Sequence, residues 1–270
     1  MNPGYESFFG LPERPFSLTQ DPRFFFKSRS HARAAETLTF GLRGSDRFVV
    51  VTGDLGVGKT MICRTLVEQL RRRVPVSYVA NPLMPAALFE RLLTEDFGVE
   101  SLQDLSAHHA EAVIIVDEAH TMPPSLLEQL LTLAFGRRYG HTAMRFAFVG
   151  QASPGEPTRL GIEELDDHVT TRVRLLPLGR EECAAYIEHR LHVASPEHRV
   201  VFSARAYDYV FALSGGVPRL INLLCERALQ EAAAAGGHHI EPATIDMAAA
   251  TLQLLRARPR RFRWYTTRVS

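Results

Sequence analysis

The chain has 270 residues, which is enough for one large domain or two smaller ones with a buried core. Its hydrophobic content of 46% and its charged content of 23% are ordinary for a soluble globular protein. A formal net charge of +1 argues against a protein whose whole surface binds nucleic acid, but it leaves a local basic patch open.

The first two thirds of the chain alternate between strand-like and helix-like patterns. After an aromatic and turn-rich start, a helix is expected over 31–42 with Ser30 as its N-terminal cap. Apolar runs typical of buried strands lie at 48–53, 76–80, 112–116, 144–150 and 171–178. Helical patterns lie between them at 59–73, 86–95 and 123–135. This alternation predicts an α/β fold, with a parallel sheet covered by helices on both faces.

The last third of the chain shows helical patterns without strands. After Leu178 the strand patterns stop, and helices are expected over 180–193, 203–213, 217–235 and 242–256. We therefore predict an α/β domain over 1–178, a small all-helical domain over 179–256 and a basic tail over 257–270.

The segment "GDLGVGKT" matches the pattern G-x-x-x-x-G-K-[ST] between a predicted strand and a predicted helix. Glycines there let backbone N–H groups turn toward phosphate oxygens, and the helix that follows presents its positive N-terminal end. The expected nucleotide-binding residues are Gly53, Asp54, Leu55, Gly56, Val57, Gly58, Lys59, Thr60 and Met61. Lys59 would reach the β- and γ-phosphates, and the Thr60 hydroxyl would ligate Mg²⁺. The motif therefore predicts ATP and Mg²⁺ as ligands; a glycine turn that merely caps a helix is the structural alternative.

The segment "VIIVDEAHTMPP" ends an apolar strand with two adjacent carboxylates. In P-loop proteins such a strand carries an Asp that supports Mg²⁺, the role expected for Asp117. Glu118 fits the base that orients the attacking water, and the alternative is an exposed acid at a strand end. His120 is expected to fix the loop after the strand. A DEAH-type helicase would share this chemistry, but no second motor domain is recognisable in a chain of this length.

The positions of the cysteines and the hydropathy of the sequence favour a cytoplasmic location. Cys63, Cys183 and Cys225 follow neither a disulfide framework nor metal-ligand spacing, which favours a reducing environment. The N-terminus lacks the apolar core of a signal peptide, and no apolar run reaches the ~18 residues of a membrane span. We expect a cytoplasmic protein, with peripheral contact to the inner membrane left open. The histidines lack acid partners at ligand spacing, so no metal other than Mg²⁺ is expected.

Several segments of the sequence resemble those of a known protein family. They are "YESFFGLPERPFSLTQDPRFFFKSRSHARA", "GDLGVGKT", "VIIVDEAH", "FVGQ", "YIEHRLHVA" and "SGGVPRLINLLCERAL". On these residues the chain resembles the ExeA/GspA-like AAA+ ATPases, which include MshM-type pilus-biogenesis and exosortase-associated ATPases. The resemblance runs to about residue 255 and covers the cytoplasmic ATPase module only. It implies a three-layer αβα nucleotide domain, a helical lid, ATP hydrolysis and action as a homo-oligomer or hetero-oligomer.

The resemblance also implies roles for individual residues. Gln151 would be the sensor-1 residue, with a loop amide as the structural alternative. Arg219 would be sensor 2 and reach the γ-phosphate from the lid, which suits a permanently charged guanidinium, whereas a solvated surface arginine is the alternative. Pro15 and Phe16 would line the adenine side, although such aromatic residues are about as often plain packing.

The chain departs from the family pattern in three places. Relatives usually carry a further helix before the strand at 112–116, where this chain has only "GVESLQDLSAHHAE". Relatives also tend to have an Asn-Leu-Glu element after that strand, where this chain has "LAFGRR". Most importantly, Asp166, Asp167 and His168 occupy the stretch where relatives carry the arginine finger. Arg172 or Arg174 could replace it, and we expect at most one of the two to point usefully. The hypothesis is that ATP binding is retained while hydrolysis is weak or depends on a partner's arginine.

Two classes of function stay open, together with a scaffold that binds nucleotide without hydrolysing it. The favoured class is an ATPase that supports assembly of an envelope machine for secretion, pilus formation or polysaccharide export, with an inner-membrane partner. The alternative is a DNA-associated transposition regulator of the MuB or TnsC type. Five arginines in 256–263, followed by Trp264 and Tyr265, could bind a membrane border or nucleic acid, or form a solvated tail.

Overall fold

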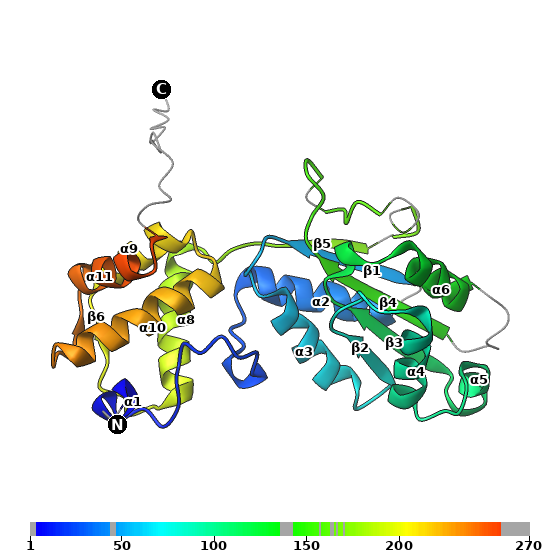
Figure 1. The fold of residues 1–270 in the computed structure, drawn as a ribbon, viewed down its shortest axis with the longest axis horizontal. Coiled ribbons are helices and arrows are strands. Elements are labelled where there is room, and N and C mark those ends of the chain that lie inside the picture. Colours follow the sequence, from blue (N-terminus) through cyan, green and yellow to red (C-terminus); the bar gives the residue numbers. More distant parts are fainter. Residues whose placement is uncertain are drawn as a thin grey trace. The chain divides into compact units, whose positions relative to one another are not determined.

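The protein was studied as a computed structural model. It describes residues 4–43, 47–135, 143–156, 158–162, 165, 167–169 and 171–254. These residues form two compact units (Figure 1). The α/β unit comprises Thr19–Glu182 and Val217–Arg219, and the helical unit comprises residues 4–18, Cys183–Gly216 and 220–254. The basic tail, with the arginines of 256–263, Trp264 and Tyr265, lies outside the described residues.

The α/β unit is built on a five-stranded sheet with the strand order β2-β3-β4-β1-β5 (Figure 1). Its strands are β1 (Phe48–Gly53), β2 (Val76–Val79), β3 (Glu111–Val116), β4 (Ala143–Gly150) and β5 (Thr171–Leu175). Every neighbouring pair in this sheet is parallel, which confirms the predicted parallel sheet. Because the strands are buried on both faces, they read as continuous apolar runs rather than alternating ones.

Helices cover both faces of the sheet and complete three layers. One face carries α2 (Arg29–Arg43) and α3 (Lys59–Leu70), and the other carries α4 (Ala86–Phe97), α5 (Leu105–His108) and α6 (Pro124–Phe135). Successive strand side chains point to opposite faces, so Val49 and Val51 pack against α2 and α3 while Phe48 and Val50 pack on the other side. Short 3₁₀ turns connect these elements at Pro22–Phe24, Leu102–Asp104 and Ala119–Thr121.

The start of α2 differs from the prediction. The helix begins at Arg29, and the Ser28 hydroxyl accepts the His31 N–H at 3.2 Å. Ser28 is therefore the capping residue, and the prediction of Ser30 is wrong. The Ser30 hydroxyl accepts the Leu176 N–H at 2.8 Å instead, a contact between residues far apart in the sequence.

The helical unit consists mainly of four long helices and a short one. These are α1 (Tyr5–Phe9), α8 (Arg180–Ala194), α9 (Ala204–Ser214), α10 (Pro218–Ala234) and α11 (Pro242–Thr251). The expectation that strands stop after Leu178 is corrected by a small parallel pair, β6 (Val201–Phe202) with β7 (His239–Ile240). None of the described helices has both the length and the apolar character needed to cross a membrane.

The N-terminal segment packs within the helical unit. The Tyr5 hydroxyl donates to Glu226 Oε2 at 2.6 Å, and the buried Arg190 guanidinium donates to the Pro15 carbonyl. Phe16 is only 1% exposed, which fits the packing alternative for this ring. This grouping differs from the predicted α/β domain of 1–178, because the partners of the first 18 residues lie in helices near the other end of the sequence.

Candidate nucleotide-binding site

In the loop between β1 and α3, glycines adopt backbone conformations and close contacts that a side chain would not allow. Gly56 and Gly58 have φ values of 81° and 105°, which L side chains rarely adopt. A Cβ on Gly53 would lie 2.9 Å from the carbonyl oxygen of Leu175 in β5. Gly58 is the N-cap of α3, without a side-chain cap. The first N–H groups of α3 therefore lack partners within the helix and face the loop, as in an anion site.

Lys59, the first residue of α3, folds back over this loop. Its side chain is buried, and Nζ donates to the carbonyl oxygens of Gly53 at 3.0 Å and Asp54 at 3.1 Å. Burial lowers the pKa of Lys59, while the charges of Glu118, Asp117 and Asp54 act in the opposite direction. The ammonium group is thus held at the loop by two carbonyl oxygens that phosphate oxygens can replace.

Asp117 follows β3 and is buried with both carboxylate oxygens occupied. Oδ1 accepts the Glu118 N–H at 2.9 Å, and Oδ2 accepts the Tyr78 hydroxyl at 3.1 Å. Burial and the nearby Asp117 charge raise the pKa of Tyr78, so its hydroxyl stays protonated and donates. The sequence does not predict this role of Tyr78, because it depends on the register of β2 against β3.

Glu118 combines a strained backbone with an accessible side chain. Its φ of 50° lies in the left-handed region, which among the described non-glycine residues is shared only with Gln253. Its side chain is 40% exposed, in contrast to that of Asp117. Backbone strain of this kind persists where the surrounding structure imposes it, frequently at functional sites.

His120 connects the ends of β3 and β4. Its Nδ1 accepts the backbone N–H of Gln151 at 3.2 Å and lies 3.5 Å from Glu118 Oε2. The predicted role of His120 in fixing this loop is confirmed by that bond. Gln151 is therefore placed by its backbone next to the strand-end acids, whereas a sensor role for its side chain stays a prediction.

Arg219 lies against the loop through its backbone. Its N–H donates to the Gly56 carbonyl at 3.3 Å, and a Cβ on Gly56 would come within 2.8 Å of the Arg219 Cβ. The structure thus brings Arg219 to the loop, as its predicted role requires. That its guanidinium senses the γ-phosphate stays a prediction.

The two candidate replacements for an arginine finger both have contacts within the chain. Arg174 Nη2 lies 3.6 Å from Asp54 Oδ2, and Arg172 Nη2 donates to the Val169 carbonyl at 3.5 Å. The two arginines are two residues apart in β5 and therefore share one strand face, and the expectation that at most one of them points usefully stays a prediction. Of the unusual triplet, Asp166 lies outside the described residues, and the His168 ring packs against Phe135.

His31 in α2 contacts the same loop from behind. Its Nε2 lies 3.0 Å from the Val57 carbonyl oxygen, and its Nδ1 lies 2.7 Å from the Ser28 hydroxyl. The ring is 5% exposed and packs edge-on against Phe25. Burial lowers the pKa of His31, partly opposed by the Val57 bond and by the charge of Glu182, which favours the neutral ring.

The lowered pKa of His31 predicts a pH-dependent stability. The unfolded chain binds a proton at His31 at a higher pH than the folded chain does. The contribution of His31 to the free energy of unfolding is therefore fully present above pH ~6.5 and is lost as the pH decreases toward the pKa of the folded state. We expect His31→Gln, which cannot titrate, to lose less free energy of unfolding between pH 7 and pH 5 than the wild type. Urea unfolding at a series of pH values measures this, and equal slopes for the two proteins would contradict it.

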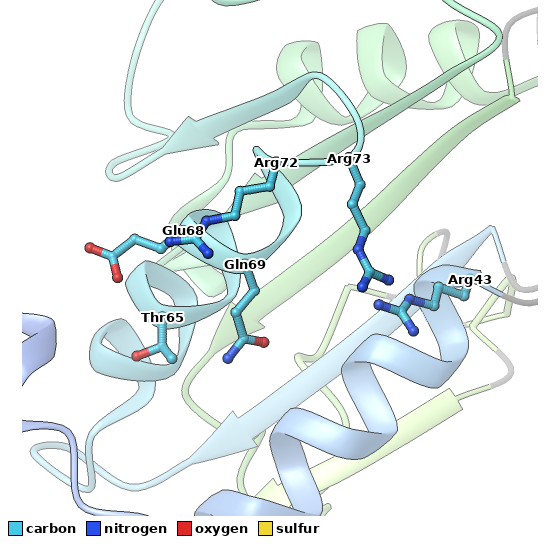
Figure 2. A pocket seen from close by; sticks show the side chains of 6 residues that line it. All are labelled: Arg43, Thr65, Glu68, Gln69, Arg72 and Arg73. Carbon is cyan, nitrogen blue, oxygen red and sulfur yellow. The ribbon is translucent and has the colours of Figure 1, made fainter.

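A second feature of the α/β unit is a pocket of about 420 Å³ near the C-terminal ends of α2 and α3. It is lined by Arg43, Thr65, Glu68, Gln69, Arg72 and Arg73. Figure 2 shows the guanidinium groups of Arg43 and Arg73 pointing toward each other, while the Glu68 carboxylate points away. Arginines at helix C-termini complement the helix dipoles, which accounts for their presence there. Because α3 begins at the glycine loop and ends at this pocket, the pocket is separate from the loop.

Comparisons with known proteins agree with this arrangement. Residues 42–154 match the family model described as an AAA domain. The chain is 35% identical over 262 residues to General secretion pathway protein A from Aeromonas hydrophila. The match covers 91% of this chain but 48% of that protein, so the chain spans about half the length of the relative.

Solved structures with a similar fold have low sequence identity. Cdc6p from Pyrobaculum aerophilum has a TM-score of 0.67 at 16% identity, covering 91% of this chain and 74% of that one. The RuvB Holliday junction branch migration motor of Thermotoga maritima has a TM-score of 0.62 at 16% identity, covering 88% and 72%. At these identities the likeness establishes the fold alone. In sequence, residues 42–154 are similar to the AAA domain family model, and 91% of the chain is similar to General secretion pathway protein A; the fold is that of the solved structures named above.

Proposed function

We propose that this chain binds ATP with Mg²⁺ and uses slow or partner-dependent hydrolysis to support the assembly of a bacterial envelope machine. ATP and Mg²⁺ binding is supported by one observation: Lys59 of the glycine loop interacts electrostatically with both Asp117 and Glu118. Both carboxylates influence the pKa of Lys59, so the cation and the two acids belong to one electrostatic site. A nucleotide phosphate and a divalent cation match that set of charges.

The residues present fit a nucleotide with Mg²⁺. The N–H groups at the start of α3 would hold phosphate oxygens, and Lys59 would exchange its two carbonyl partners for them. Among the described residues, no group of three or more His, Cys, Asp or Glu could hold a metal. Mg²⁺ would be held by Thr60 and Asp117 together with phosphate oxygens, and it would neutralise charge that develops on the phosphates.

Glu118 is the residue proposed to orient and deprotonate the attacking water. Its partial exposure leaves the carboxylate accessible, while Asp117 is held in place by Tyr78. This division of labour between two adjacent acids follows from their different environments. Arg219, placed at the loop by its backbone, is the proposed sensor of the bound nucleotide.

Slow hydrolysis is proposed because the region of the arginine finger is unusual. Arg174 in β5 is paired with Asp54 in the glycine loop of the same chain, and Arg172 contacts Val169. Neither contact favours reaching into the site of a neighbouring subunit. A missing finger can cost ~10³–10⁵ in turnover.

The proposed cellular role rests on the name of the relative, General secretion pathway protein A from Aeromonas hydrophila, and the chain spans about half of that protein. We propose that the chain acts in the cytoplasm as an oligomer, next to an inner-membrane partner of a secretion, pilus or export system. A DNA-associated transposition regulator is the alternative that the experiment must separate.

The test uses the purified chain with ATP, with and without a chelator. We expect ATP binding in the presence of Mg²⁺, slow phosphate release that stops on chelation, and rates within about twofold of the wild type for Arg172→Ala and Arg174→Ala. Brisk turnover that either arginine variant abolishes would overturn the proposal of a missing finger. An ATP-stimulated, salt-dependent shift of duplex DNA would favour the transposition regulator instead.

A further inference from the structure

The contacts of His31 determine which of its ring nitrogens carries the proton. A backbone carbonyl oxygen can only accept a hydrogen bond, so the Nε2 atom at 3.0 Å from the Val57 oxygen must be the N–H. The unprotonated Nδ1 then accepts the Ser28 hydroxyl at 2.7 Å. The Ser28 oxygen in turn accepts the His31 backbone N–H at 3.2 Å. Each polar atom of the ring thus has one defined partner.

This bond fixes one peptide plane of the glycine loop. In a trans peptide the C=O and the following N–H point in opposite directions, and the described residues contain no cis peptide. With the Val57 carbonyl directed at His31, the Gly58 N–H points away from His31. If the peptide turned over, a carbonyl oxygen would take the place of that donor and would repel an anion.

Gly58 and His31 are also matched in space. A Cβ at position 58 would lie 2.8 Å from His31 Nε2, so the ring occupies the room that the absent side chain leaves. The contact is buried, so water competes little with it. Two features of the loop, the glycine and the direction of its carbonyl, are therefore linked to one side chain of α2.

We propose that His31 is a positioning residue of the nucleotide site, which acts through the Val57–Gly58 peptide to set the affinity for nucleotide phosphates. This inference rests on the proposed function, since it concerns the binding of the same ligand. His31 itself need not touch the nucleotide.

Two amide substitutions separate this role from plain packing. The terminal nitrogen of Gln lies near the position of His Nε2, and that of Asn lies near Nδ1. His31→Gln can therefore still donate to the Val57 carbonyl, whereas His31→Asn keeps only the position of the Ser28 contact. A matched control is His109→Asn, because His109 Nε2 also lies 3.1 Å from a backbone carbonyl oxygen, that of Phe97, away from the loop.

Affinities for ATP and ADP, measured by titration calorimetry, give the first readout. We expect His31→Asn to weaken both about tenfold, which corresponds to ~1.4 kcal/mol, the upper end of what one hydrogen bond contributes, and His31→Gln and His109→Asn to stay within about threefold of the wild type. Thermal unfolding of each variant verifies that it is folded. Equal affinities for folded His31→Asn and His31→Gln would overturn the proposal.

A second readout does not require nucleotide. Long-range ¹H–¹⁵N spectra of the histidine rings report the tautomer, with the His31 signal identified by its loss in His31→Gln. We expect a protonated Nε2 and a bare Nδ1; a protonated Nδ1 would overturn the inference even if ATP binds. If the wild type binds no ATP while the tautomer is as expected and hydrogen exchange of 53–60 rises only in His31→Asn, the proposed function fails, and only the effect of His31 on the conformation of the Val57–Gly58 peptide is supported.

Discussion

Lys59→Met is expected to lower the affinity for ATP by at least about a hundredfold. The ammonium group would donate charge-assisted hydrogen bonds to phosphate oxygens, each contributing ~1.5–3 kcal/mol, and methionine offers none. Lys59 already satisfies two carbonyl oxygens at 3.0 and 3.1 Å, so it needs only a small rearrangement to bind phosphate. Titration calorimetry with ATP in the presence of Mg²⁺ measures the loss.

The same substitution should change the stability of the protein without nucleotide only slightly. Burial lowers the pKa of Lys59, which means that the folded state disfavours its charged form. Since relief of the buried charge is opposed by the loss of the bonds to Gly53 and Asp54, we expect only a small change in the free energy of unfolding, while the increase in Tm caused by ATP disappears. Lys27→Met, which removes the chain's other lysine, is the control and should keep that increase. An affinity within threefold of the wild type for Lys59→Met would contradict a phosphate site at this loop.

Glu118→Gln is expected to lower the rate of ATP hydrolysis by ~10²–10⁴ while ATP still binds. Glutamine keeps the shape of the side chain but cannot accept a proton from water. Single-turnover release of phosphate at saturating ATP measures the chemical step separately from binding. Hydrolysis at the wild-type rate in this variant would assign the base to another group.

The backbone of Glu118 allows a second measurement at the same position. Its φ of 50° destabilises a non-glycine residue by ~1 kcal/mol, whereas glycine adopts this φ without that strain. We expect Glu118→Gly to unfold at a higher urea concentration than Glu118→Gln, although both are expected to hydrolyse ATP slowly. Such a pair would show that stability is given up at this residue in favour of the position of its carboxylate.

Local patterns were sufficient to predict the sheet and the centre of the site. A short motif predicts a role for each glycine and for the lysine of Gly53–Thr60, and β1 begins and ends at the predicted residues. Asp117 and Glu118 could be assigned to the same edge as the loop, because parallel strands bring their carboxyl ends together.

What the sequence missed depends on partners far along the chain. Ser28 and Ser30 are equally good caps by type, and the choice between them depends on a contact from Ser30 to Leu176. The Tyr78 hydroxyl reaches Asp117 only because Tyr78 pairs with Ile115 in the sheet. His31 reaches Val57 because α2 packs against α3 and β1, an arrangement that helical periodicity does not specify. The strands β6 and β7 have two residues each, too few for an alternating pattern.

The membership of the N-terminal segment in the helical unit has a consequence for biosynthesis. Tyr5 is 221 residues from its partner Glu226, and Arg190 is 175 residues from Pro15. At ~5–20 residues per second, the ribosome needs on the order of ten to forty seconds after residue 18 to produce residue 226. Phe9 and Phe16 are both buried in the folded protein, and during that interval, while the α/β unit is synthesised, the residues that cover them are not yet complete. The nascent chain therefore exposes these aromatic residues until the rest of the helical unit has been synthesised.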